Sequence, residues 1–242
     1  MYQLSDEQKD EWLNTIEFDL TTFCNLSCQD CAHGCDKFPS ADSLLEIHVI
    51  QFISESLQLG KQWRKIGLLG GEPTLNPHLN GILSLLGYYQ QLYPETNIWM
   101  MTNGTDKQVV NRIIKKFPWL TVLTNTDHSY HHAFYVSPTD EGLLGSNTRC
   151  EALHCGVGLG PYGFTPCVLG TTMHRIFGYE TIKSLKDITY NRCMSMFPEY
   201  CQHCGWYLVD SDCREDGRIW SYERGYMSES WKKIYELKDD NK

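Results

Sequence analysis

Four cysteines lie within twelve residues near the start of the chain, in the stretch FDLTTFCNLSCQDCAHGCDKFP, residues 18–39. Three of them, Cys24, Cys28 and Cys31, have the spacing C-x-x-x-C-x-x-C and directly follow an apolar run that is typical of a strand. Thiols at such short spacings pair as disulfides, hold a zinc ion or hold an iron–sulfur cluster. Which of these sites they form decides the chemistry of the whole protein.

The eleven cysteines of this 242-residue chain fall into two groups, four between residues 24 and 35 and seven between residues 150 and 213. Residues 1–15 are polar and acidic, unlike a signal peptide, and no apolar run reaches transmembrane length. We therefore expect a cytoplasmic protein with no membrane partner. Cytoplasmic thiols stay reduced, and an odd count fits a disulfide framework poorly, so two metal sites are favoured.

The overall composition is that of an ordinary folded protein, with 41% hydrophobic and 21% charged residues. The formal net charge is −9, and the lysines and arginines are scattered along the chain. Because no basic stripe could follow a phosphate backbone, nucleic acid is not expected as a partner.

Strand-like and helix-like segments alternate through the first half of the chain. Strands are predicted at residues 16–21, 65–70, 97–104 and 120–126, and helices at residues 41–59, about 79–89 and 105–117. This alternation predicts a parallel sheet with right-handed crossovers. It is too short for eight repeats, so we expect an α/β fold built as a partial, open parallel β/α barrel.

Each predicted strand ends in a loop whose residues could do chemistry. The cysteine loop follows the first strand, GGEP (Gly70–Pro73) the second, TNG (residues 102–104) the third, and NTDHSYHHAF (residues 125–134) the fourth. Chemistry in such folds lies at the carboxyl ends of the strands. We therefore expect these loops to form one site.

The alternation stops after Pro138. The segment CGVGLGPYGFTPC (Cys155–Cys167) has the pattern of a hairpin, CQHC follows at residues 201–204, and residues 227–240 read as a charged terminal helix. We predict three parts: a core over residues 1–148, a small cysteine-rich α+β auxiliary domain over 149–213, and a helical extension over 214–242.

Zinc is the main alternative for the first cysteine group. Cys28 and Cys31 form a C-x-x-C pair, Cys24 adds a third thiol, and Cys35 could complete a tetrahedron. A structural zinc loop, however, gains nothing from a position above a parallel strand beside glycine-rich loops. A cluster with three protein ligands leaves one iron open for a cosubstrate, and this alternative is favoured.

The C-x-x-x-C-x-x-C motif after a strand, followed by GGEP, resembles the radical S-adenosylmethionine (SAM) superfamily over residues 16–136. The resemblance implies that Cys24, Cys28 and Cys31 bind a 4Fe–4S cluster whose fourth iron is chelated by SAM. It also implies that the Gly-Gly-Glu turn holds the SAM amino group, through backbone carbonyls or the glutamate carboxylate. These residues are Gly70, Gly71 and Glu72.

Two positions of this resemblance have competing interpretations. Asn103 is placed to reach the SAM ribose, but Asn-Gly is also a common turn pair. The residue before the third cysteine is usually aromatic in the family and packs near the adenine, whereas here it is Asp30; Phe23 or His33 could substitute.

The implied chemistry is cleavage of SAM by one electron to methionine and a 5′-deoxyadenosyl radical, which removes hydrogen from a substrate. The electron would come from an external reductant of the flavodoxin or ferredoxin type. The protein would orient the reactants and exclude water.

The second cysteine group resembles the auxiliary-cluster extensions called SPASM and twitch domains. The matching residues are Cys155, Gly163, Cys167, Cys201 and Cys204. One auxiliary cluster, expected to be 4Fe–4S, would take the four cysteines of this set, with Cys150 as the main rival for one place. A zinc ribbon is the alternative. The other cysteines, at positions 35, 193 and 213, are expected to be ordinary thiols.

The loop after the fourth strand supplies candidate catalytic residues, Asp127 and His128 first, although an exposed polar loop is the alternative. Arg149 could bind a substrate carboxylate or phosphate. The leading hypothesis is a radical SAM oxidoreductase whose auxiliary cluster accepts an electron, oxidising or cross-linking a peptide or small molecule. A glycyl-radical activase and a zinc-stabilised binding module are the alternatives.

Overall fold

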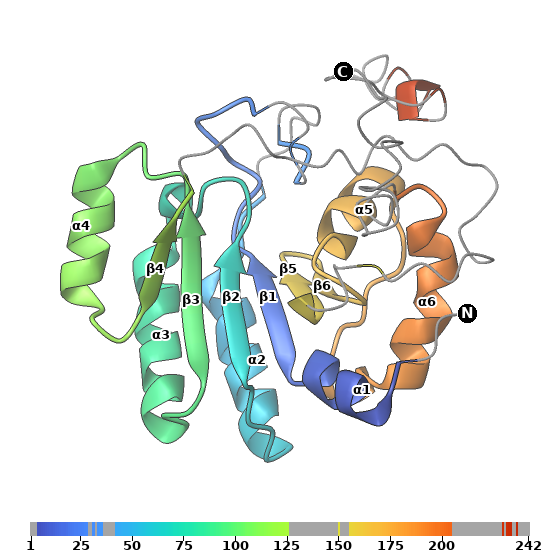
Figure 1. The fold of residues 1–242 in the computed structure, drawn as a ribbon, viewed down its shortest axis with the longest axis horizontal. Helices are drawn as coiled ribbons and strands as arrows, with labels where there is room; N and C mark the ends of the chain where they lie inside the picture. The colour runs from blue at the N-terminus through green and yellow to red at the C-terminus, as the bar shows by residue number, and fades with distance from the viewer. Residues whose placement is uncertain are drawn as a thin grey trace.

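The computed structural model describes residues 4–28, 31, 33–35, 42–125, 150, 155–204, 229, 231–233 and 236. Within these residues the chain forms a mixed α/β fold around one six-stranded sheet (Figure 1). The strands are β1 (Thr15–Asp19), β2 (Lys65–Leu69), β3 (Asn97–Thr102), β4 (Thr121–Thr124), β5 (Val157–Gly160) and β6 (Gly163–Thr165). The α-helices are α1 (Asp6–Leu13), α2 (Glu46–Gln58), α3 (Leu79–Leu92), α4 (Lys107–Lys116), α5 (Gly170–Phe177) and α6 (Tyr190–Cys201), and the short 3-10 turns are η1 (Pro73–Leu75) and η5 (Leu185–Asp187).

The strand order is β4-β3-β2-β1-β5-β6. All neighbours pair in parallel except β5 and β6, which form an antiparallel hairpin. The four predicted strands and the hairpin are therefore confirmed, and so is the mostly parallel α/β sheet. The described sheet is not closed, and its curvature into a partial barrel stays a prediction.

The hairpin at residues 157–165 continues the main sheet. β5 pairs in parallel with β1, with Ile16 opposite Val157 and Phe18 opposite Leu159. Helices α5 and α6 then pack beside this end of the sheet (Figure 1). The second half of the chain thus shares a sheet with the first, and the predicted domain boundary near residue 148 lies outside the described residues.

Alternation along β1 separates an apolar face from a polar one. Ile16 and Phe18 are completely buried, and Phe18 packs edge-on against Phe52 of α2 with ring centroids 5.0 Å apart. The opposite face carries Glu17 and Asp19, which are also buried. Because burying a carboxylate costs free energy, core packing alone does not explain why this face carries two of them.

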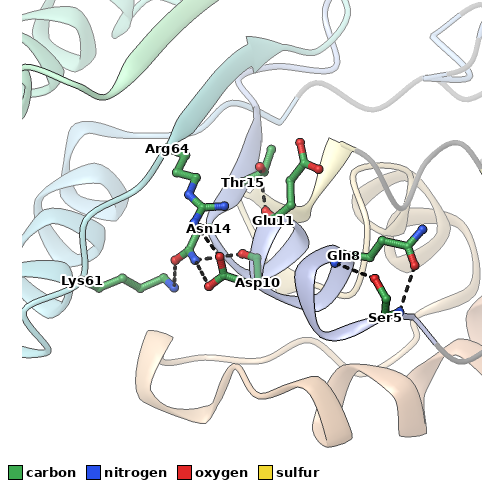
Figure 2. Close-up of polar contacts among 8 residues, drawn as sticks. All are labelled: Ser5, Gln8, Asp10, Glu11, Asn14, Thr15, Lys61 and Arg64. Atoms are coloured by element: carbon green, nitrogen blue, oxygen red, sulfur yellow. Dashed lines mark hydrogen bonds and ion pairs between the residues drawn. The ribbon is translucent and has the colours of Figure 1, made fainter.

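The amino-terminal helix α1 is fastened to the sheet far from the cysteine loop. Ser5 and Gln8 form a capping box, with hydrogen bonds of 2.9 and 3.2 Å (Figure 2). Asp10 accepts hydrogen bonds from the Asn14 amide at 2.9 Å and from the Arg64 guanidinium at 2.5 Å. These contacts hold the start of β1 against the segment that leads into β2, which fixes the two strands that end in the cysteine loop and the Gly-Gly-Glu turn.

Within the described residues, no helix has the length and apolar character needed to span a membrane.

Candidate functional site

The loops that follow β1, β2 and β3 meet at one edge of the sheet, as the sequence predicted. β1 and β2 are adjacent, and so are β2 and β3, with all three running in the same direction. The Gly71 N–H donates to the Thr21 carbonyl at 2.7 Å, and the Glu72 N–H donates to the Phe23 carbonyl at 2.7 Å. The Gly-Gly-Glu turn therefore lies directly against the backbone that leads into Cys24.

This close approach explains both glycines. Gly70 has a φ of 133°, a conformation that side chains disfavour. A Cβ on Gly71 would lie 2.2 Å from the Phe23 carbonyl oxygen, well inside the closest non-bonded contact that a Cβ makes. The turn can contact the cysteine loop only because neither residue has a side chain.

Glu72 braces the ends of two strands. Its side chain is 2% exposed, and its Oε1 accepts hydrogen bonds from the Thr74 N–H at 3.0 Å, the Thr74 hydroxyl at 2.6 Å and the Thr102 hydroxyl at 2.7 Å. Its Oε2 accepts one from the Asn103 N–H at 2.7 Å. The resemblance implied that this carboxylate could hold the SAM amino group; in the structure it links β2 to β3.

We expect Glu72→Gln to destabilise the fold. An amide in place of the carboxylate turns an N–H₂ group toward one of these donors, so one hydrogen bond to a charged group is lost at a cost of about 1.5–3 kcal/mol. Chemical unfolding should show a lower midpoint with an unchanged m-value. Glu46→Gln on α2, whose half-exposed carboxylate contacts His78, is the control and should change the midpoint much less. Equal effects of the two variants would contradict the bracing role.

Asn103 connects the end of β3 to the first cysteine. Its Nδ2 donates to the Asn25 side chain at 2.8 Å and lies 4.0 Å from the Cys24 sulfur. Its Oδ1 accepts from the Thr105 N–H at 3.0 Å and from the Thr105 hydroxyl at 2.7 Å. Gly104 has a φ of 67°, which favours glycine after Asn103, and the Asn103 side chain also reaches the cysteine loop. Its contact with a ribose stays a prediction.

An open groove of about 440 Å³ lies beside this turn. It is lined by Asn25 and by four residues at the start of α4, namely Thr105, Asp106, Lys107 and Gln108. The groove places open volume next to the loop that carries Cys24.

The thiols of the first group lie in one loop. Burial raises the pKa of Cys24, and the nearby negative groups of Cys31 and Glu72 raise it further. Cys35 donates a hydrogen bond to Cys31, which lowers the pKa of Cys31 and raises that of Cys35. Cys35 therefore lies beside a predicted ligand. In the described part of the chain, no three Cys, His, Asp or Glu side chains converge to hold a metal ion. Residues 29, 30, 32 and 36–41 of this region, including Asp30, lie outside that part.

In the second group, Cys150 and Cys201 lie close enough to Cys167 for their charges to affect its pKa. The partly buried Cys167 has a raised pKa, mainly because of burial and then because of Cys201 and Cys150. Burial and Cys150 likewise raise the pKa of Cys201 to about 12. Cys204 follows at the end of α6, where its N–H donates to the Cys201 carbonyl at 3.2 Å. Cys155 instead donates a hydrogen bond to Glu17, whose pKa burial raises to about 7. The structure thus places Cys150 near Cys167 and Cys201.

Several predicted residues lie outside the described part of the chain. These are the catalytic candidates Asp127 and His128, together with Arg149 and Cys213. Their roles stay predictions.

Sequence reasoning missed a polar cluster beside the cysteine loop. The buried Asp19 at the end of β1 lies near Arg175 of α5 and His33 of the loop, whose positive charges oppose the rise in its pKa that burial causes. Arg175 donates to the His33 carbonyl at 2.7 Å. Burial and the hydrogen bond to Asp42 raise the pKa of Tyr162 in the β5–β6 turn, and the nearby charges of Arg175 and Asp19 have smaller effects on it. The one available signal was a carboxylate within an apolar strand.

Comparison with known proteins agrees with this geometry. Residues 19–134, which hold the first cysteine group and the Gly-Gly-Glu turn, match the family model of the 4Fe-4S single cluster domain. The chain also has the fold of BtrN in a crystal structure in complex with AdoMet and 2-DOIA, with a TM-score of 0.53 and 13% identity over 85% of this chain and 94% of BtrN. Both matches agree with the resemblance to radical SAM proteins that the sequence shows. The resemblance seen in the sequence is confirmed.

A second neighbour matches over a smaller region. SuiB from Streptococcus suis, solved with the precursor peptide SuiA, aligns with a TM-score of 0.37 and 15% identity over 45% of this chain, which spans only 23% of SuiB. SuiB bound to S-adenosylmethionine aligns with a TM-score of 0.33 and 15% identity, over 45% of this chain and 22% of SuiB. No curated protein sequence matches the chain.

Proposed function

We propose that this protein is a radical SAM enzyme that removes hydrogen from an organic substrate and oxidises it. The observation that carries the proposal is the meeting of three loops at one sheet edge: the loop with Cys24, Cys28 and Cys31 after β1, the Gly-Gly-Glu turn after β2, and Asn103 after β3. The match to a 4Fe–4S single cluster domain over the same residues supports it.

The residues at this edge fit a cluster and SAM. Three thiols in one loop supply the soft donors that iron–sulfur clusters require. The Cys24 sulfur lies 4.0 Å from the Asn103 amide nitrogen, and hydrogen bonds to cluster sulfurs tune the reduction potential. The Gly-Gly turn brings backbone rather than side chains toward the same loop, which leaves carbonyl groups to receive an amino group. Cys24, Cys28 and Cys31 would hold the cluster, and Gly70 and Gly71 would hold SAM.

When bound, the cluster and SAM supply a one-electron cleavage that yields methionine and a 5′-deoxyadenosyl radical. The chain itself contributes position and exclusion of water. Glu72 fixes the distance between the Gly-Gly turn and Asn103 through its hydrogen bonds to both sides of the β2–β3 edge. Asn103 in turn connects to Cys24, so the three loops are held as one unit.

For the second site we propose one auxiliary cluster held by Cys150, Cys167, Cys201 and Cys204. The proximity of the first three supports this set, which replaces Cys155 of the sequence-based set with its rival Cys150. A cluster ligated by four cysteines has no open iron, so its role would be to accept an electron from the substrate radical. The net reaction would then be a two-electron oxidation.

Single substitutions should separate the two candidate ligands. Anaerobically reconstituted Cys150→Ser is expected to lose the auxiliary cluster and to fall from about eight to about four irons per chain. Cys155→Ser, five residues away on the same segment, is expected to keep about eight because it removes only the hydrogen bond to Glu17. Iron analysis and the absorbance near 400 nm measure the result, and the reverse outcome would restore Cys155 as the ligand.

The substrate side of the proposal draws on the BtrN structure, which contains AdoMet and 2-DOIA. That protein is matched over 94% of its length, so we propose that this chain likewise takes SAM together with one small organic ligand, with a reductant of the flavodoxin or ferredoxin type. The stoichiometry is the test: each substrate consumed should yield one 5′-deoxyadenosine and a product two electrons more oxidised. Regeneration of SAM during turnover would contradict the oxidation.

A further inference from the structure

Helix α4 is a concentration of positive charge in a chain whose formal net charge is −9. Its sequence, KQVVNRIIKK, has four basic residues and no acidic one. Lys107, Arg112 and Lys115 are exposed, and at about 3.6 residues per turn they lie on the side of the helix opposite the buried Val110 and Ile113. We call these three basic residues the basic face of α4.

Helix stability does not explain the whole basic face. Cations stabilise the C-terminal end of a helix, which accounts for Lys115 in the last turn. Lys107, however, is the first residue of α4, where a cation is unfavourable, and Arg112 lies in the middle of the helix. Among the described residues, none of the three forms an ion pair, whereas Arg64 and Arg192 each contact a carboxylate. The basic face therefore presents charge that the described part of the chain does not neutralise.

The start of α4 is connected to the first cysteine loop. Asn25, the residue after Cys24, donates from its Nδ2 to the hydroxyl of Thr105, two residues before α4, at 2.7 Å. Asn103 accepts from the Thr105 N–H at 3.0 Å, and its Nδ2 lies 4.0 Å from the Cys24 sulfur. Lys107 lines the open groove beside this turn together with Asn25. A protein that docks on α4 would therefore stand next to the loop that carries Cys24.

We propose that the basic face of α4 is the docking surface for an acidic electron-carrier protein of the flavodoxin type. This inference rests on the proposed function, which requires an external reductant. The carrier would lose one electron and the cluster held by the cysteine loop would gain it, with no bond made or broken in this step.

Charge complementarity identifies this partner. In a chain that is negative overall, a local positive face directs an acidic protein to one place on the surface, which is the β4 end of the sheet (Figure 1). Ile114 on the same helix is 47% exposed and adds a small apolar contact, in keeping with the small interfaces of electron-transfer complexes. Three cations are too few to hold a nucleic acid against the net charge of −9.

The binding test compares two double variants that change the net charge equally. Arg112→Glu/Lys115→Glu reverses most of the basic face, and Lys186→Glu/Lys233→Glu, at two exposed lysines outside α4, is the control. Fluorescence anisotropy measures the binding of labelled flavodoxin to each reconstituted protein at low and at physiological salt. We expect the α4 variant to bind about 10-fold more weakly and to lose most of the salt dependence, and the control to stay within about threefold of the unmodified protein.

Methionine release with two reductants separates docking from damage to the site. With photoreduced flavodoxin at limiting concentration, the α4 variant should release methionine about 10-fold more slowly, whereas with excess dithionite all three proteins should agree within about twofold. If the α4 variant does not fold, Arg112→Gln/Lys115→Gln replaces it and should show the same losses at about a third of their size.

Three results would overturn the inference: equal flavodoxin binding by the α4 variant and its control, an equal loss of methionine release with both reductants, or an unmodified protein that binds an oligonucleotide or anionic vesicles but no flavodoxin. Failure of the unmodified protein to release methionine even with dithionite would instead refute the proposed function, which is a different result.

Discussion

Substitution of Cys28 by Ala is expected to abolish reductive cleavage of SAM. A cluster of this kind needs three thiolates from the chain, and Cys28 is the middle residue of the C-x-x-x-C-x-x-C motif. The variant should retain about four irons per chain in the auxiliary site, while the release of methionine and 5′-deoxyadenosine falls to the rate of the control without enzyme. Chromatography after reduction with dithionite under anaerobic conditions measures both products.

Cys193→Ala is the matched control for this variant. Cys193 lies on α6, is completely buried in the apolar core, and belongs to neither proposed ligand set. Its substitution should reduce stability modestly through lost packing and leave the rate of SAM cleavage per iron unchanged. If Cys28→Ala cleaves SAM as well as Cys193→Ala does, the first cysteine group does not hold the reactive cluster.

Substitution of Gly71 by Ala is the second change with a large expected effect. The added Cβ would lie 2.2 Å from the Phe23 carbonyl oxygen and 3.2 Å from the Cys24 Cβ, so the turn and the cysteine loop must move apart. We expect a loss of about 3 kcal/mol or more in the free energy of unfolding, and loss of SAM binding because the backbone carbonyls shift with the turn. Denaturant unfolding and calorimetric titration with S-adenosylhomocysteine measure the two effects.

Gly60→Ala is the control for Gly71→Ala. It separates the effect of the steric clash at Gly71 from the cost of placing a side chain on a left-handed backbone. Gly60 follows α2 with a φ of 61° and has open space around its Cβ position, so substitution there costs only the left-handed backbone, about 1–2 kcal/mol. SAM binding should be unaffected in this control. Equal binding losses in the two variants would show that global destabilisation, rather than the Gly71 contact, weakens the site.

Much of the fold could be predicted because local pattern and tertiary structure agree in the first half of the chain. The strand at residues 65–69 and the helix from Leu79 were predicted close to their observed bounds, since an apolar run and a glycine turn mark each transition. Helices α5 and α6 were not predicted. The sequence of α5 is GTTMHRIF, and its threonines and glycine favour helix weakly, so packing against β5 decides its structure.

The candidate site could be located from the sequence, but the roles of its members could not all be assigned. The cysteines and glycines follow successive predicted strands, and the carboxyl ends of parallel strands lie at the same edge of a sheet, so the loops could be predicted to meet there. Spacing alone, however, cannot distinguish Cys150 from Cys155 as a ligand, and it could not show the hydrogen bond between Cys155 and Glu17 of β1. Likewise, the sequence could not show that Glu72 has its oxygens occupied while Asp19 Oδ1 has no hydrogen-bond partner among the described residues, because both facts depend on neighbours distant along the chain.

The central claim is that the first cysteine group and the Gly-Gly-Glu turn hold a 4Fe–4S cluster and SAM for reductive cleavage. The most direct measurement is chromatography of the anaerobically reconstituted protein after addition of dithionite and SAM. The account predicts methionine and 5′-deoxyadenosine in equal amounts, and neither product from Cys28→Ala. A protein that carries zinc, or that carries iron but releases no methionine from SAM, would contradict it.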